Sequence, residues 1–307
     1  MSFSTINELK SYHADQAQIA KKIYIESRTA SADADDWSIA LRSARKQISA
    51  ALRASTLLSD VAIALKESGQ HMLVFRHITA PPISQDQFSL ACQGWRKSTE
   101  KPNGPKIRND EAQFIAAIFN ERRSRSLTPW IDANRPPQKR EIRRLLWTIA
   151  PLIASQQIQT MQRTRAASAQ EKAVTAMLFE KGWEKVPSLL LDTRAALLPR
   201  HFMHKTRYAT ATTTPQEVDI ALGLRDTVVL ALECKVSNDQ TNSVKRINDV
   251  LKKSNSWKTH WGSFVKPAAL LQGVIAPKDV ARLIDDGVIV FWTHNLSALE
   301  NFLDRHS

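Results

Sequence analysis

The chain has 307 residues, of which 43% are hydrophobic and 24% charged, and this composition excludes a disordered or fibrous protein. Its 43 basic and 30 acidic residues give a formal net charge of +13, so we expect a polyanionic partner. Two cysteines are too few for a disulfide scaffold or a four-cysteine zinc site. No stretch is long and apolar enough to span a membrane, and Met1–Lys10 lacks the pattern of a secretory signal. We therefore expect a cytoplasmic protein with no membrane contact.

The first half of the chain is predicted to be mainly helical. Apolar residues at helical spacing predict helices within Trp37–Leu57, Glu111–Ser124 and Arg140–Ile153. Pro151 falls inside the last of these runs and is expected to interrupt it. We therefore expect residues 1–160 to form a mainly helical, basic region suited to binding a polyanion such as DNA.

After residue 160 the pattern changes to alternating helices and strands. Ser168–Gly182 is predicted to be a helix with Ser168 as its N-cap and Gly182 as its stop. The later predicted elements are the strands Glu217–Leu222 and Thr227–Val236, a helix from Ser243 to Trp257, the strand Ala268–Ile275, the helix Lys278–Asp285, the strand Val288–Trp292 and the helix Ser297–Asp304. This alternation predicts an α/β core with a mixed sheet over residues 161–307.

Positive charge is concentrated in the middle of the chain. Residues 94–146 contain 13 basic and 6 acidic side chains, whereas residues 215–307 contain 11 of each. Within the middle segment, the turn-rich stretch that begins at Gly94 carries candidate phosphate contacts: Arg96, Lys97, Lys101 and Lys106. A solvated surface explains the same run of charges equally well.

One group of residues suggests metal-dependent chemistry. Strand periodicity puts Glu233 and Lys235 on one face, and it puts Asp219 on a face opposite Val218 in the preceding strand. The short link Gly223–Asp226 allows the two strands to pair, which would bring Asp219 near Glu233. Two close carboxylates repel each other unless a cation lies between them, and Mg²⁺ is suited to that position. A salt bridge on an exposed sheet face is the alternative.

These residues resemble the active site of the PD-(D/E)XK nucleases, with Val218 where the motif's name has proline. The stretch Glu233–Asn248, together with Trp257 and Phe291–His294, resembles more narrowly the type II restriction endonucleases of the XamI kind. The resemblance implies a restriction-endonuclease-like fold and Mg²⁺-dependent, sequence-specific hydrolysis of double-stranded DNA that leaves 5′-phosphate ends. It also implies a homodimer that acts in a restriction-modification system as a defence against foreign DNA.

The resemblance also implies roles for individual residues. Asp219 and Glu233 correspond to metal ligands, the backbone carbonyl of Cys234 to a further ligand, and Lys235 to the catalytic lysine. Many such nucleases add a glutamate from an earlier helix, for which Glu171 is the candidate. The spacing suits a capping box with Ser168 equally well, so both roles of Glu171 stay open.

The segment after the catalytic strand is rich in amides, hydroxyls and basic groups. Candidate DNA contacts in it are Asn238, Asn242, Ser243, Lys245 and Arg246. A helix cap at Asn242 or Ser243 is the other interpretation, and both can hold at once. The sequence contains no P-loop, so no ATP is expected. A structure- or modification-specific nuclease of the same superfamily and a non-catalytic DNA-binding protein are the alternative functions.

Overall fold

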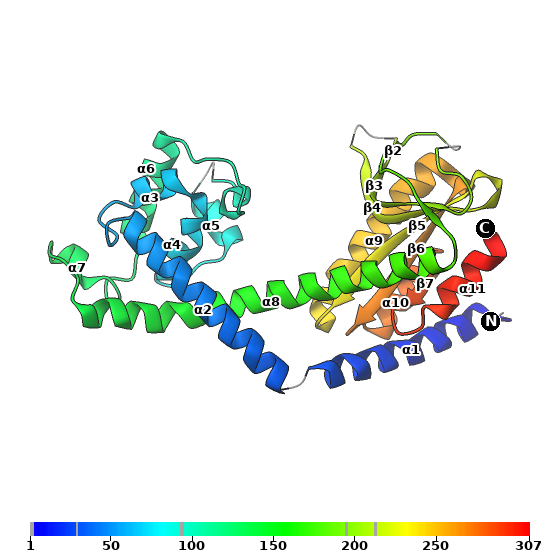
Figure 1. Ribbon diagram of the computed structural model, residues 1–307, viewed down its shortest axis with the longest axis horizontal. Helices are drawn as coiled ribbons and strands as arrows, with labels where there is room; N and C mark the ends of the chain where they lie inside the picture. Colours follow the sequence, from blue (N-terminus) through cyan, green and yellow to red (C-terminus); the bar gives the residue numbers. More distant parts are fainter. Residues whose placement is uncertain (1–2, 29, 93–94, 194–195, 212–213) are drawn as a thin grey trace. The chain divides into compact units, whose positions relative to one another are not determined.

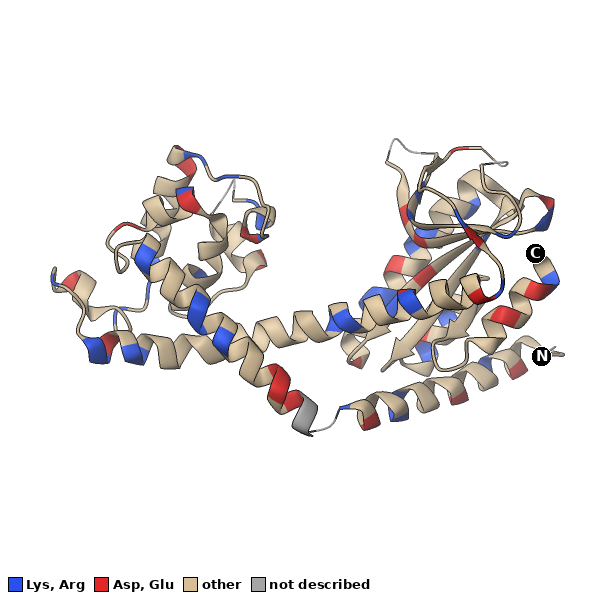
Figure 2. Ribbon diagram, in the orientation of Figure 1, with Lys and Arg blue, Asp and Glu red and all other residues tan. Residues whose placement is uncertain are grey.

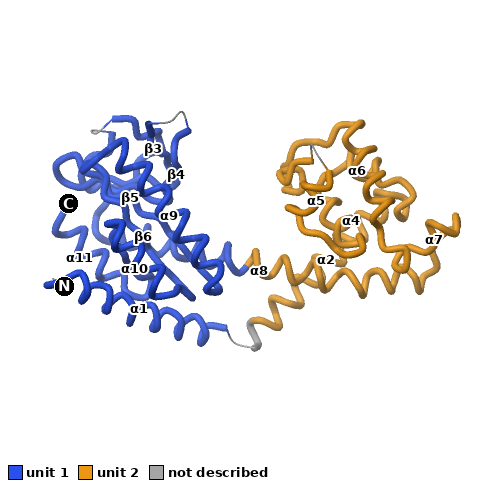
Figure 3. The backbone as a smooth tube through the Cα atoms, turned by 180° about the vertical axis from the view of Figure 1, so that it is seen from behind, with its two compact units in different colours: residues 1–29, 162–307 blue, residues 30–161 orange. Residues whose placement is uncertain are grey.

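The computed structural model describes residues 3–28, 30–92, 95–193, 196–211 and 214–307; Gly94, where the expected basic turn begins, lies outside them. The chain forms two compact units (Figure 3). The first comprises the described residues within 1–29 and 162–307, and the second those within 30–161.

The first unit contains a mixed sheet, which confirms the predicted α/β core. The strands run in the order β1-β3-β4-β5-β6-β7, and β2 also pairs with β3. The pairs β3–β4 and β4–β5 are antiparallel, while the other pairs are parallel. The strands are β1 (Glu184–Lys185), β2 (Leu190–Leu191), β3 (His201–Tyr208), β4 (Gln216–Gly223), β5 (Val229–Ser237), β6 (Val265–Gly273) and β7 (Ile289–Trp292).

Helices cover both faces of this sheet (Figure 1). The end of α8 and the helix α11 pack on one face, where Leu178 and Leu303 join a buried cluster with Leu232 of β5. The helices α1, α9 and α10 pack on the other face, where Ala17 and Ile247 share clusters with core residues of β6 and β7. The helical elements of this unit are α1 (Ile6–Ser27), α9 (Gln240–Trp261), α10 (Pro277–Asp285), α11 (Ser297–His306), and the short η3 (Arg225–Thr227) and η4 (Gly262–Phe264).

The helix α1 belongs to the unit with the sheet, although we expected it to be part of the helical region of residues 1–160. Ala17 and Ala20 are buried against the sheet side of this unit. The indole N–H of Trp292 donates to Nδ1 of His13 at 3.0 Å. Small residues let the helix approach closely, and this specific bond to β7 then fixes its position. The expected boundary at residue 160 therefore misses this helix.

The helix α8 (Lys139–Glu180) is continuous over 42 residues, so two expectations about it are wrong. Pro151 does not end it, because Ile149 and Ile153, both fully buried, gain enough packing to offset the lost hydrogen bond. Ser168 lies inside the helix and is not an N-cap. The predicted stop at Gly182 is confirmed, since this residue has φ of +73° and the Trp183 N–H donates to the Leu178 carbonyl at 2.9 Å.

The second unit is helical in its described part, as predicted. Its elements are α2 (Ala30–Ala54), α3 (Val61–Glu67), η1 (Gly69–His71), α4 (Met72–Ile78), α5 (Gln85–Ala91), η2 (Lys97–Glu100), α6 (Asn109–Arg122), α7 (Pro129–Asp132) and the first part of α8. Lys and Arg positions lie along α2 and α8 as well as in the loops (Figure 2). Positive charge in this unit is therefore carried on helices too.

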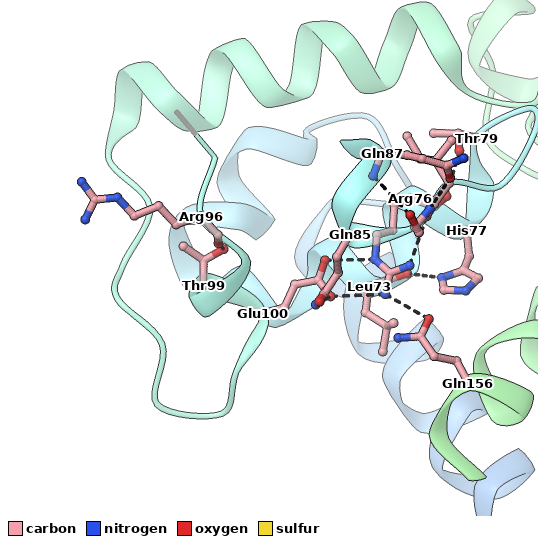
Figure 4. A network of polar contacts seen from close by, with 12 residues as sticks. Leu73, Arg76, His77, Thr79, Gln85, Gln87, Arg96, Thr99, Glu100 and Gln156 are labelled. Atoms are coloured by element: carbon pink, nitrogen blue, oxygen red, sulfur yellow. Dashed lines mark hydrogen bonds and ion pairs between the residues drawn. The ribbon is translucent and has the colours of Figure 1, made fainter. Parts of the chain in front are cut away.

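A buried ion pair anchors η2 to the rest of the second unit (Figure 4). The Arg76 Nε donates to Glu100 Oε1 at 3.0 Å, and the two side chains are only 2% and 5% exposed. Gln85 and Gln156 extend the network at 2.6 Å from Glu100 and 3.1 Å from Arg76. Because every charged group in it is paired or hydrogen-bonded, the network holds in place the segment that carries the candidate phosphate contacts.

Candidate active site

The predicted hairpin of β4 and β5 is present and brings Asp219 to Glu233. The last paired residues of this hairpin are Ile220 and Leu232, and Asp219 and Glu233 are the next residues on either strand. The Oδ2 atom of Asp219 accepts the backbone N–H of Cys234 at 2.8 Å. The carboxylate thus lies against the β5 backbone where the ladder between the strands stops.

The expected alternation of faces along β4 is wrong around Asp219. Val218 and Ala221 pack in the same buried cluster, although their spacing of three would put them on opposite faces of a regular strand. On the neighbouring β3, Lys205 has φ of +57°, in the left-handed region that interrupts strand geometry. This irregularity lets Asp219 turn toward the β5 backbone.

Glu233 is fully buried and is held by two ammonium groups. Lys235 Nζ lies 2.6 Å from Glu233 Oε2, and Lys253 Nζ lies 3.0 Å from Oε1 and 2.9 Å from Oε2. Burial raises the pKa of Glu233, and Asp219 raises it further, while the two lysines oppose the shift. The arrangement is a buried carboxylate whose charge two ammonium groups offset.

Lys235 lies between two carboxylates. Besides Glu233, its Nζ contacts Asp249 Oδ2 at 2.9 Å. Burial lowers the pKa of Lys235, but Glu233 and Asp219 outweigh burial and leave this pKa above its ordinary value. The side chain is therefore an ammonium at neutral pH, suited to holding an anion or a water molecule and unsuited to accepting a proton.

Two residues of this site, Asp249 and Lys253, were missed by the sequence reasoning. They lie four residues apart on α9 and so share one face of the helix. The spacing was visible, but no sequence signal showed that this face points to β5. At the start of this helix Val244 is exposed while Ile247 is buried.

The Cys234 side chain faces the core and not the carboxylates. It packs in the cluster that contains Leu232 and Leu270. Burial raises the pKa of its thiol, and the charges of Asp219 and Glu171 add to the effect. The thiol is therefore protonated and is no candidate for a nucleophile. The other cysteine, Cys92, is also buried and free.

Glu171 contacts β3, not a helix cap. Its Oε2 atom lies 2.8 Å from His204 Nε2 and 3.1 Å from Lys205 Nζ. The capping-box interpretation is wrong because α8 runs through Ser168 without a break. The negative charge of Glu171 helps to raise the pKa of the Cys234 thiol. Its carboxylate, however, contacts basic side chains of β3 and not Asp219 or Glu233.

The candidate DNA contacts after β5 differ in their exposure. Asp239 is the N-cap of α9 and accepts the Asn242 N–H at 2.7 Å, so the expected caps at Asn242 or Ser243 are wrong. Ser243 is fully buried and donates to Asp279 Oδ2 at 3.1 Å, which removes its hydroxyl from solvent. The exposed or half-buried candidates are Asn238, Asn242, Lys245 and Arg246.

The candidate phosphate contacts of the second unit lie in and around η2. Arg96, Lys101 and Lys106 are exposed. Lys97 is exposed as well but forms an ion pair with Asp86. These four belong to a different unit from the carboxylates.

Two kinds of feature are absent from the described residues. Nowhere in this part of the chain do three or more His, Cys, Asp or Glu side chains gather in an arrangement that could hold a metal ion. The described helices also include none that is long and apolar enough to cross a membrane.

Comparisons with known proteins place the chain in a family. The type II restriction enzyme XamI of Xanthomonas campestris pv. amaranthicola is 27% identical over 191 residues, which cover 61% of this chain and 66% of that enzyme, slightly less than two thirds of its length. Protein VC1899 of Vibrio cholerae, a solved structure, is aligned over 87% of this chain and 56% of its own, with 11% identity and a TM-score of 0.30. The model of the XamI restriction endonuclease family matches residues 56–292, which is most of the chain. The chain therefore belongs to the XamI restriction endonuclease family.

Proposed function

We propose that this protein is a type II restriction endonuclease that hydrolyses double-stranded DNA at a specific sequence, with Mg²⁺ as cofactor, and leaves 5′-phosphate and 3′-hydroxyl ends. Family membership supports the reaction class. The observation that carries the assignment of the site is the placement of Asp219 beside Glu233 at the end of the β4–β5 ladder, with Lys235 on the same strand as Glu233.

The donor set fits Mg²⁺. Asp219 and Glu233 offer carboxylate oxygens, and the Cys234 carbonyl would be the backbone ligand between them. Mg²⁺ prefers oxygen ligands and usually keeps several waters, so two carboxylates and one carbonyl leave positions for water and for a substrate phosphate. Two ammonium groups already contact Glu233, which supports this carboxylate as a binding position for a cation.

Bound Mg²⁺ would supply a water of lowered pKa and would stabilise negative charge on the phosphate. The chain's own part follows from the contacts of Lys235. Its ammonium, fixed between Glu233 and Asp249, would orient the attacking water or a phosphate oxygen and offset the charge that develops there. Glu171 would act from outside the metal site by holding His204 and Lys205 of β3.

DNA would be held by basic and amide groups other than the carboxylates and lysines of the candidate active site. We propose base contacts by Asn242, Lys245 and Arg246, with Asn238 nearby, and phosphate contacts by the basic segment around η2. The proposal includes a cytoplasmic homodimer that requires no ATP and defends the cell against foreign DNA.

Cleavage assays with Mg²⁺ and with EDTA test this function. Glu233→Gln and Lys235→Met should abolish cleavage of phage DNA and leave DNA binding intact, because affinity comes mainly from phosphate contacts elsewhere. The matched control is Glu8→Ala, since Glu8-Leu9-Lys10 repeats the Glu-x-Lys spacing on α1 and should not affect activity. Cleavage by Glu233→Gln at the wild-type rate would refute the assignment.

Sequencing the ends of digested DNA then separates the alternatives. One repeated sequence at every end supports a type II restriction enzyme. Ends found only at modified bases or at branched DNA would favour a modification- or structure-specific nuclease. Binding without any cleavage would favour a non-catalytic DNA-binding protein.

A further inference from the structure

Lys253 occupies the carboxylate that the proposed metal ion needs. Its Nζ lies within 3.0 Å of both oxygens of Glu233, and Lys235 shares Oε2. Neither oxygen of Glu233 is therefore without an ammonium partner. A metal ion that binds Glu233 must therefore either displace Lys253 or share the carboxylate with its positive charge.

The two lysines are not equivalent. Lys235 is held on its other side by Asp249 at 2.9 Å, whereas Lys253 forms its ion pair with Glu233 alone among the described residues. The Lys253 side chain is 16% exposed and the Lys235 side chain 10%. Lys253 also extends from a helix on four flexible carbons, so its ammonium can leave Glu233 without any movement of β5.

We propose that Lys253 is an internal competitor for the metal ion: its ammonium neutralises Glu233 in the DNA-free protein and weakens metal binding there. This inference rests on the proposed metal-dependent function. At a few ångströms and partial burial, the interaction of one unit charge with another is strong, so its removal should change metal affinity at least tenfold.

Titration with Mn²⁺, followed by the loss of the free-ion EPR signal at about pH 8, measures this competition without any catalytic readout. Lys253→Met keeps the packing of the side-chain stem and removes the charge, so Mn²⁺ should bind at least roughly tenfold more tightly than in the wild type. Lys253→Arg keeps the charge and should bind like the wild type. The control Lys252→Met removes an exposed charge from the next position of α9 and should also behave like the wild type.

Three outcomes decide between the explanations. Unchanged Mn²⁺ affinity in a folded Lys253→Met protein would overturn the inference. If Lys253→Arg bound Mn²⁺ as tightly as Lys253→Met, the effect would be steric and not electrostatic. Glu233→Gln tests the underlying function separately. If that variant binds Mn²⁺ like the wild type, the metal does not lie at Glu233 and the proposed site itself fails.

Discussion

Asp219 Oδ2 accepts the backbone N–H of Cys234 at 2.8 Å, so one carboxylate both faces the Glu233 position and closes the end of the β4–β5 ladder. On the proposed function, this side chain would combine a structural role with a catalytic one. Substitutions that separate the hydrogen bond from the charge can tell these roles apart.

Asp219→Asn keeps an oxygen that can accept the Cys234 N–H and removes the charge. We expect cleavage to fall at least roughly 100-fold, because a metal ligand contributes several kcal/mol of transition-state stabilisation. Thermal unfolding should stay close to that of the wild type. Asp226→Asn, on the exposed turn after β4, is the matched control and should retain full activity. A large loss of stability in Asp219→Asn would point to a mainly structural role.

Arg246→Ala tests base reading at the start of α9. If Arg246 contacts a base edge, the change should cost about 1–3 kcal/mol on the specific site and little on random DNA. The specific-to-nonspecific affinity ratio, measured in Ca²⁺ without cleavage, reports this difference. Lys252→Ala on the same helix should leave the ratio unchanged. Equal weakening on both DNAs would assign Arg246 to phosphate contact.

Joint neutralisation of Arg96, Lys101 and Lys106 tests the basic segment around η2. Each phosphate contact adds about 0.9 to the slope of log affinity against log salt, so the slope should fall by roughly 3. Lys97 is left in place because it already pairs with Asp86. The control is neutralisation of the exposed Lys21 and Lys22 of α1. A slope equal to that of the wild type would make the segment a solvated surface.

Arg76→Met tests the buried ion pair beneath η2. Loss of the guanidinium leaves the Glu100 carboxylate buried without its charge partner, which should destabilise the second unit by about 3–5 kcal/mol. Urea unfolding measures the change as an earlier transition. Arg108→Met breaks an exposed pair with Asp110 and should cost about 0–1 kcal/mol. Similar urea midpoints for the two variants would mean that the buried pair contributes no more stability than the exposed pair.

His13 should make stability depend on pH. Burial lowers its pKa from 6.5 to about 4, so it stays neutral in the folded protein while the unfolded chain takes up a proton. Its contribution is complete above pH 6.5 and is lost as the pH falls toward 4, by up to about 3 kcal/mol. Thermal unfolding of His13→Gln should lose part of the pH dependence seen in the wild type. The exposed His260→Gln should retain it in full.

The hairpin that carries Asp219, Glu233 and Lys235 was predictable, because a four-residue link joins two apolar runs. The helices after β5 were predictable for similar reasons. The direction of Asp219 was not predictable, because the alternation of faces along β4 is interrupted around it. The first residue of each helix was harder to predict. A hydrogen bond from the Asn242 N–H to the Asp239 side chain sets the start of α9, although Asn242 and Ser243 themselves looked equally suitable as caps.

The features that the sequence did not predict depend on tertiary contacts. Pro151 and Ser168 are local signals for an interruption and a start, yet packing of the surrounding apolar residues keeps α8 continuous. β3 was not predicted at all, and the left-handed Lys205 at its centre breaks the alternation on which strand prediction relies. Asp249 and Lys253 had a visible spacing but no signal for the strand they would meet.

Both native thiols are buried and free, and burial raises the pKa of each. Thiol reagents attack the thiolate, so they should leave Cys92 and Cys234 untouched in the folded protein. A cysteine introduced at an exposed position would then be the one that reacts. Dyes attached at Leu90→Cys on α5, where the side chain is 82% exposed, and at Lys252→Cys on α9 would form a ruler between the two units. Energy transfer between these dyes would report the distance in solution, with and without DNA, and no native cysteine would have to be replaced first.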